Sequence, residues 1–120
     1  MTLFFRIPGL RLRSGDNGRG DWRGRAARVK RERRIVALVL GARRPVAFPV
    51  RVTVVRVAPR ALDSDGLASS AKAVRDEVAR WLGVDDGVAE RAGDVEWCIR
   101  AERAGVREYA VRIEIEEVAT

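Results

Sequence analysis

The chain has 120 residues and a mass of 13.3 kDa, which matches one domain of common size. Apolar residues make up 47% of it and aromatic residues only 6%, so we expect a core of Val, Ala, Leu and Ile. There is no histidine and a single cysteine, Cys98. This excludes Ser-His-Asp and Cys-His catalysis, histidine-ligated zinc and an internal disulfide, and leaves the chemistry to carboxylates, lysine and arginine.

Charge is divided unevenly along the chain. Residues 1–60 carry 16 basic and 3 acidic side chains, whereas residues 61–120 carry 8 basic and 14 acidic ones. The net charge of +7 is therefore the sum of a strongly basic half and an acidic half. Such a basic region favours a polyanionic partner, above all nucleic acid. A general preference for Arg explains why 22 of the 24 basic residues are Arg, but not why they gather in one half.

The first part of the chain predicts a strand, a loop and a basic helix. Residues 2–8 are typical of a short edge strand, and the Gly-rich stretch 9–20 of a mobile loop with little to bury. Between Asp21, a suitable N-cap, and Gly41, apolar residues recur at three- and four-residue steps and predict a helix with one buried stripe. The stripe consists of Trp22, Ala26, Val29, Val36 and Leu40, and the opposite face carries Arg23, Arg25, Arg28, Lys30, Arg31, Arg33 and Arg34.

A second strand and a second helix follow. The β-branched stretch 50–58, which lies between two prolines, predicts a strand. The 3.6-residue period of apolar side chains over 67–82 predicts a helix that Ser64 or Asp65 can cap and that ends at Gly83. The stretch 84–94 is expected to be a loop.

The end of the chain predicts two strands. Apolar and polar residues alternate over 95–102 and over 109–116 on either side of a turn at 104–105, which predicts an antiparallel hairpin. The order β-α-β-α-β-β predicts one α+β domain over 1–120, with one mixed sheet and two helices packed on one face. The opening apolar run is too short for a signal peptide or a membrane-spanning helix, so we expect a cytoplasmic protein without a membrane partner.

Two pairs of aspartates flank the predicted second helix: Asp63 and Asp65 precede it, and Asp85 and Asp86 follow it. Mg²⁺ is usually bound by one or two carboxylates together with water and substrate phosphate, so each pair is a candidate metal ligand. The alternative is structural, because Asp is common both at helix caps and in solvated turns. Spacing alone leaves both interpretations open.

The segments LDSDGL (62–67) and LGVDDG (82–87), with Lys72 and Asp76 between them, resemble the signature of the RusA family of Holliday-junction resolvases. The Arg-rich helix is similar to that of phage-type members. The resemblance covers essentially the whole chain and is strongest over 61–87. It implies a homodimeric endonuclease that depends on Mg²⁺, for which Mn²⁺ can substitute, and that cuts four-way DNA junctions during recombination and repair in the bacterial cytoplasm.

The resemblance also implies roles for particular residues. Asp63, Asp65 and Asp86 match the family's metal-binding aspartates, and Lys72 its catalytic lysine, for which the plainer interpretation is a solvated helix lysine. Two departures stand out: Gly66 replaces the usual Asn, and about three extra residues separate Asp65 from Lys72. The proposed DNA contacts are Arg19, Arg23, Arg25, Arg28, Lys30, Arg31 and Arg34, which would bind phosphates without reading bases.

Helix length bears on how such a site is assembled. A helix over 66–83 separates the two acidic pairs by roughly 25 Å at ~1.5 Å per residue. Either the chain after Gly83 turns back, or a two-fold dimer brings Asp63 and Asp65 of one chain to Asp86 of the other.

The runner-up function is a non-catalytic, basic nucleic-acid-binding module, in which the aspartates only cap helices. A purely structural interaction protein would leave the two-sided charge unexplained. Trp22, Trp81 and Trp97 all lie on apolar stripes, so we expect them in the core. Cys98 has no basic neighbour in sequence and is expected to be structural.

Overall fold

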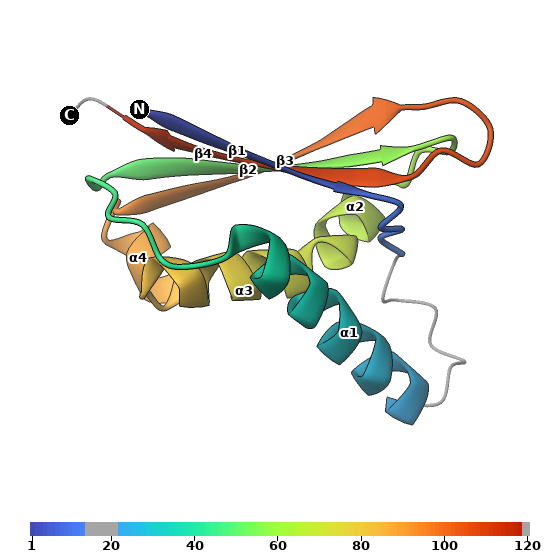
Figure 1. Ribbon diagram of the computed structural model, residues 1–120, viewed down its shortest axis with the longest axis horizontal. Helices are drawn as coiled ribbons and strands as arrows, with labels where there is room; N and C mark the ends of the chain where they lie inside the picture. Colours follow the sequence, from blue (N-terminus) through green and yellow to red (C-terminus); the bar gives the residue numbers. More distant parts are fainter. Residues whose placement is uncertain (14–21, 119–120) are drawn as a thin grey trace.

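The protein was studied as a computed structural model, which describes residues 1–13 and 22–118, apart from the side chain of Asp86. Four strands form one sheet, and the helices all lie against the same face of it (Figure 1). In chain order the elements are β1 (Thr2–Pro8), α1 (Trp22–Leu40), β2 (Val50–Ala58), α2 (Ser64–Ser70), α3 (Lys72–Leu82), α4 (Asp86–Arg91), β3 (Val95–Arg103) and β4 (Ala110–Glu117). This confirms the predicted α+β class with one mixed sheet.

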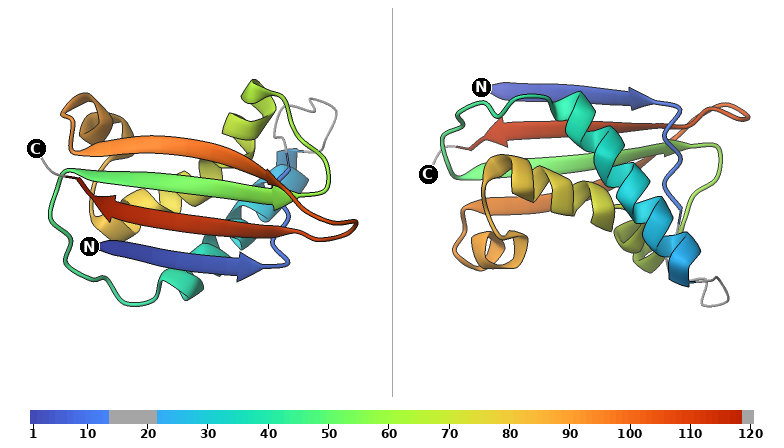
Figure 2. Two further views of the ribbon diagram at one scale, coloured as in Figure 1. Left: turned by 90° about the horizontal axis from the view of Figure 1, so that it is seen from above. Right: turned by 60° about the horizontal axis from the view of Figure 1, so that its bottom comes forward.

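The strand order is β1-β4-β2-β3, with β1 at one edge as predicted (Figure 2). β4 is antiparallel to both β1 and β2, whereas β3 is parallel to β2. The predicted hairpin of the last two strands is therefore wrong, because β2 lies between them. β2 buries apolar side chains on both faces, since Val54 and Val55 are both buried, and such a strand is more stable at the centre of a sheet than at its edge. Its parallel partner is reached through the helical crossover α2–α4.

The core lies between the sheet and the helices. From the sheet it takes alternate residues of each strand, such as Val52 in β2 and Ile113 in β4. From the helices it takes one stripe of α3, including Val74 and Val78, and the C-terminal part of α1. These side chains are at most 2% exposed, so each contributes about 1.5–3 kcal/mol of burial free energy.

The predicted second helix is divided into two. α2 ends at Ser70 and α3 begins at Lys72, with Ala71 (φ −92°, ψ −2°) between them. The hydroxyls of Ser69 and Ser70 donate to the carbonyl oxygens of Gly66 and Leu67, three residues earlier in each case. Serine hydroxyls compete in this way with the helical hydrogen bonds, which accounts for a break that hydrophobic periodicity does not reveal. The predicted loop after Gly83 likewise contains a short helix, α4.

The prediction of a loop with little to bury over 9–20 is wrong for its first residues. Leu10 is 9% exposed and Leu12 only 1%, and both belong to the core. The buried guanidinium of Arg56 donates from Nε to the Leu12 carbonyl oxygen at 3.0 Å, and from Nη1 to that of Arg60 at 2.8 Å. The chain after β1 is therefore fixed as far as residue 13. The rest of that prediction, with Asp21 and Arg19, lies outside the described residues.

Only the C-terminal half of α1 buries its apolar stripe. Val36 and Leu40 are in the core, but Ala26 is exposed, Val29 is 38% exposed and Trp22 is 65% exposed. The N-terminal half extends away from the sheet and beyond the other helices (Figure 1). A helix of 19 residues is about 28 Å long, longer than the 11-residue α3 on which it packs. The prediction that Trp22 packs in the core is therefore wrong.

The other two tryptophans behave more as expected. Trp81 in α3 is 8% exposed and packs edge to face with Phe5 at 6.0 Å between ring centroids. Trp97 in β3 is half-buried, and the guanidinium of Arg75 lies 5.0 Å from its ring centroid. Neither ring projects from the molecule as Trp22 does.

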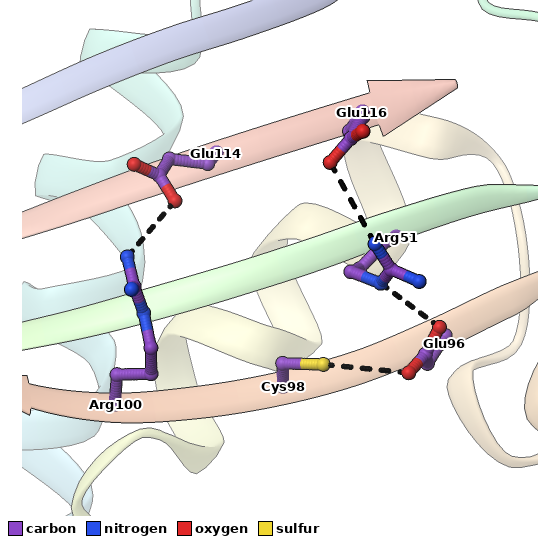
Figure 3. A network of polar contacts seen from close by, with 6 residues as sticks. All are labelled: Arg51, Glu96, Cys98, Arg100, Glu114 and Glu116. Carbon is purple, nitrogen blue, oxygen red and sulfur yellow. Dashed lines mark hydrogen bonds and ion pairs between the residues drawn. The ribbon is translucent and has the colours of Figure 1, made fainter. Parts of the chain in front are cut away.

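The sheet face away from the helices carries a lattice of ion pairs (Figure 3). Arg51 in the central strand lies between Glu96 and Glu116, at 3.0 and 3.8 Å. Arg100 pairs with Glu114 at 3.4 Å. The acidic side chains of this face are therefore charge-compensated.

Cys98 lies on the same face, opposite Trp97 as predicted, and its Sγ donates to Glu96 Oε1 at 3.7 Å (Figure 3). Burial raises the pKa of the thiol, and the nearby Glu96 carboxylate raises it further. The thiol stays protonated at neutral pH, which is consistent with a structural role and unfavourable for a nucleophile.

Candidate nucleic-acid interface

The first acidic pair lies at the start of α2. Asp63 is the N-cap, and its Oδ1 accepts a hydrogen bond from the Gly66 backbone N–H at 2.6 Å. Asp65 lies in the first helical turn, and both aspartates are exposed. The capping interpretation is thus confirmed for Asp63, in place of the Ser64 or Asp65 cap that the sequence predicted. Capping occupies one carboxylate oxygen and leaves the other available.

The second pair starts α4. Asp85 is its N-cap and accepts from the Val88 backbone N–H at 3.0 Å, and Asp86 is the first helical residue. α2 and α4 lie at opposite ends of α3 (Figure 1), whose 11 residues extend about 16 Å. Within the described residues, no three acidic or cysteine side chains gather closely enough to hold a metal ion. Within one chain, the length of α3 separates the start of α2, which carries the first pair, from the start of α4, which carries the second.

Asp63 and Asp65 supply carboxylate oxygens, the type of ligand that Mg²⁺ prefers. Mg²⁺ retains several waters and is usually bound through one or two carboxylates and the phosphates of a substrate. Both carboxylates are exposed at the start of the same helix, so water and a substrate phosphate have access to them. Gly66, where the RusA signature has Asn, contributes only its backbone N–H to the cap and adds no polar side chain.

A cleft of about 450 Å³ lies between α1 and the junction of α2 with α3. Arg25 and Arg28 line it from α1, and Lys72 from the start of α3. The fold therefore brings the lysine that the resemblance assigns to catalysis beside two arginines assigned to DNA. Other residues of the lining are Arg13, Val29, Glu32, Ser69, Ser70, Ala73 and Asp76.

Arg13 belongs to this cleft although the sequence analysis did not assign it. Its signal was present in the alternation of Leu10, Arg11, Leu12 and Arg13, which places the leucines inward and the arginines outward. The alternation is too short to predict a strand, and the Gly-rich sequence around it favoured the prediction of a loop.

The remaining basic residues of α1 differ in their surroundings. Arg23 lies 5.4 Å from the exposed Trp22 ring. Lys30 and Arg34 are exposed. Arg31 lines a second cavity of about 330 Å³, which adjoins the cleft and is also lined by Arg11, Arg13 and Arg28. Arg33 has a structural role, because it forms a 3.2 Å ion pair with the buried Glu77 of α3.

Glu32 is a carboxylate buried in this basic surrounding. It is 4% exposed, and the Nε of Arg28 lies 3.9 Å from its Oε1. Burial raises the pKa of Glu32 above its ordinary value of 4.5, although Arg28, Arg31 and Arg13 oppose that shift. The charged form is therefore costly in the folded protein.

Replacing Glu32 by Gln is expected to increase the free energy of unfolding at pH 7. Since the folded-state pKa is raised, the contribution of Glu32 to stability is greatest below pH 4.5 and is lost as the pH rises through the folded-state value. The gain of the variant over the wild type should therefore shrink toward low pH. Urea unfolding between pH 3.5 and 7.5 measures it, with the exposed Asp94→Asn as control. A variant less stable at pH 7 would contradict the expectation.

Comparison with protein-family models gave no match for the chain, and a search among curated proteins found no significant similarity. Among the described residues, no helix is both long enough and apolar enough to cross a bilayer.

Proposed function

We propose that the protein is a Mg²⁺-dependent, structure-selective endonuclease that resolves four-way DNA junctions, as its resemblance to the RusA family implies. The observation that supports this most is the cleft that joins Lys72 to Arg25 and Arg28. The short helix α2 begins with Asp63 and Asp65 and ends at this cleft. Cations for a DNA backbone and carboxylates for a metal therefore lie at the two ends of one short element.

Each side chain has a role in this proposal. Arg25 and Arg28 bind phosphates of the DNA backbone and hold it in the cleft, without reading bases. Lys72 neutralises the phosphate to be cleaved, and Asp63 and Asp65 hold the metal. A Mg²⁺ ion held there would supply the activation of a water and the stabilisation of charge on the phosphate oxygens, so histidine is not required. The proposed setting is the bacterial cytoplasm.

A two-fold dimer completes the carboxylate set in this proposal, since α3 separates Asp63 and Asp65 from Asp86 within one chain. A mixed dimer of Asp63→Asn and Asp86→Asn chains tests the arrangement. With shared sites, one site loses both carboxylates and the other remains intact, so the mixed dimer should recover up to half of the wild-type sites. Neither homodimer should be active. A mixed dimer as inactive as both homodimers would show that each site belongs to one chain.

The activity itself is tested with a labelled four-way junction and a linear duplex of matched sequence, in Mg²⁺ and in EDTA. We expect paired nicks near the branch point that require Mg²⁺, and no cleavage of the duplex. Junction binding without cleavage in Mg²⁺ or Mn²⁺ would overturn the enzymatic proposal.

That outcome would favour the second candidate, a non-catalytic nucleic-acid-binding module. One observation supports it: Asp63 and Asp85 both serve as helix caps, so their presence has a structural explanation. For such a module, removing a negative charge at Asp65 should slightly tighten DNA binding and change nothing else.

A further inference from the structure

A strand-end cavity of about 360 Å³ lies where the two parallel strands of the sheet finish. β2 and β3 are aligned as far as Ala58 and Arg103, and both end on the side of the sheet where α2 lies (Figure 1). Arg56 and Arg103 line the cavity from these strands, and Arg60 lines it from the connection to α2. None of the three is among the described residues that line the cleft or the second cavity. The strand-end cavity is therefore a separate basic site that the proposed function does not use.

The three arginines border one space because of the strand register. Arg56 is aligned with Ala101, and alternate residues of a strand point to the same face, so Arg103 shares the face of Arg56. The connection that carries Arg60 is fixed beside this face, since Nη1 of Arg56 donates to the Arg60 carbonyl oxygen at 2.8 Å. Residues from two strands and a loop thus place their positive charges around the same cavity.

Arg56 is a buried cation without a carboxylate partner. It is 7% exposed. Within the described part of the chain, its guanidinium donates to two neutral carbonyl oxygens, those of Leu12 and Arg60, and no carboxylate lies within ion-pair distance of it. Burial lowers the pKa of Arg56 below its ordinary value, and nearby Arg11 lowers it further. Because buried charges in proteins are normally paired with an opposite charge, the cavity beside Arg56 favours an anion.

The other two arginines are available to such an anion. Arg60 and Arg103 are exposed, and among the described residues neither side chain has a hydrogen-bond or ion-pair partner. The acidic residue of the lining, Glu102, already pairs with Arg112 at 2.7 Å. Guanidinium groups bind phosphate oxygens through charge-assisted and often bidentate hydrogen bonds. A phosphate group is therefore the ligand chemistry that this lining fits.

The strand-end cavity lies close to the carboxylates proposed to hold the metal. Ala61, which lines the cavity, precedes Asp63 by two residues along the chain. A chain spans at most about 3.6 Å per residue, so the Cα atoms of Ala61 and Asp63 are no more than about 7 Å apart. A DNA strand carries one phosphate per ~3.4 Å of helix axis. A strand with one phosphate in the cavity can therefore place another beside Asp63 within a few nucleotides.

We propose that the strand-end cavity binds a backbone phosphate of DNA, on the same strand as the phosphate at Asp63 and Asp65 and within a few nucleotides of it. Arg60 and Arg103 bind its oxygens directly, and the buried charge of Arg56 attracts it. This rests on the proposed function in its choice of DNA, but the phosphate site itself requires no metal and no cleavage.

The first test measures binding of a labelled four-way junction in EDTA, by fluorescence anisotropy over a range of salt concentrations. Arg60→Gln/Arg103→Gln removes the two exposed cations and leaves Arg56, which holds the backbone, in place. The variant should bind at least about tenfold more weakly, the effect of losing charge-assisted hydrogen bonds. Its log–log salt slope should fall by about 0.9 for each protein chain in the complex. The matched control, Arg6→Gln/Arg44→Gln, removes two exposed arginines elsewhere and should stay within about twofold.

A second test locates the contact with junctions that each carry one neutral methylphosphonate in place of a phosphate. At one position the modification should weaken binding of the wild type, but should not weaken binding of Arg60→Gln/Arg103→Gln any further. Two changes that remove the same contact are not additive, whereas changes at independent contacts are. This position should lie within about three nucleotides of the nick that Mg²⁺ produces.

Inorganic phosphate alone, at constant ionic strength, tests a free anion as the other source of the same chemistry. Its binding is followed by NMR through the side-chain Nε–H signal of Arg56. If phosphate shifts this signal but the double variant binds the junction like the wild type, the cavity takes a free phosphate and the proposal is wrong.

Other results would also overturn the proposal. These are an equal loss of affinity in the control, and methylphosphonate effects that add to those of the variant at every position. If the junction binds as expected but Mg²⁺ produces no nicks, the phosphate site stands and the endonuclease proposal fails. If nicks form but the variant binds normally, only the phosphate site fails. Circular dichroism confirms that each variant is folded.

Discussion

Replacing Asp65 by Asn is expected to reduce Mg²⁺-dependent cleavage of a four-way junction by at least about 100-fold, while junction affinity in EDTA stays within about twofold. Loss of a group that only orients a metal ligand already costs about 10–100-fold, and a direct ligand contributes more. Asp65 is exposed in the first turn of α2, so the neutral amide fits without repacking. Single-turnover cleavage at saturating protein separates this effect from binding.

Two further variants strengthen that experiment. Asp63→Asn should be equally inactive yet folded, because Asn caps a helix as well as Asp does. Asp94→Asn removes an exposed carboxylate outside the proposed site and should cleave like the wild type. If Asp65→Asn cleaves normally, the assignment of these carboxylates to a metal is wrong.

Replacing Leu12 by Ala is expected to lower the free energy of unfolding by about 2–5 kcal/mol. This is the range observed when a large buried aliphatic side chain is truncated to Ala and leaves a cavity. Leu12 is 1% exposed, and its carbonyl oxygen accepts the hydrogen bond of the buried Arg56 guanidinium. Urea denaturation measures the change. In contrast, Leu38→Ala, at a residue that is 76% exposed, should change stability by no more than about 0.5 kcal/mol.

This prediction also concerns the second cavity, because Leu12 lies between Arg11 and Arg13. A change of less than about 1 kcal/mol for Leu12→Ala would mean that the chain after β1 is not part of the core. Arg11 would then be a solvated side chain rather than a fixed cation.

Much of the fold follows from local patterns in the sequence. The alternation in β3 and β4 and the β-branched run of β2 predicted strands close to their observed bounds, and Gly83 ends α3 in the left-handed conformation (φ 78°) that its position indicated. These features depend on neighbours a few residues apart, so the sequence displays them directly. The strongly basic α1 was evident for the same reason.

The candidate site could be predicted only in part from such local patterns. The sequence identified Arg25, Arg28 and Lys72 as separate candidates, but their meeting in one cleft results from the packing of α1 on α3. It gave Arg11 and Arg13 no role, because their positions depend on the burial of the adjacent leucines. The expected separation of the acidic pairs rested on one continuous helix over 66–83, which the structure divides at Ala71.

By itself, the sequence determined the α+β class, the position and type of most elements, and the concentration of positive charge on one helix. Only the tertiary structure decided the order of the strands, the exposure of Trp22 and the two basic recesses beside α1. Periodicity records which face of an element is apolar, but not which distant element covers it. Which element covers an apolar face depends on the lengths and packing of all the elements together. The N-terminal half of α1 is exposed because α1 is longer than α3, on which it packs.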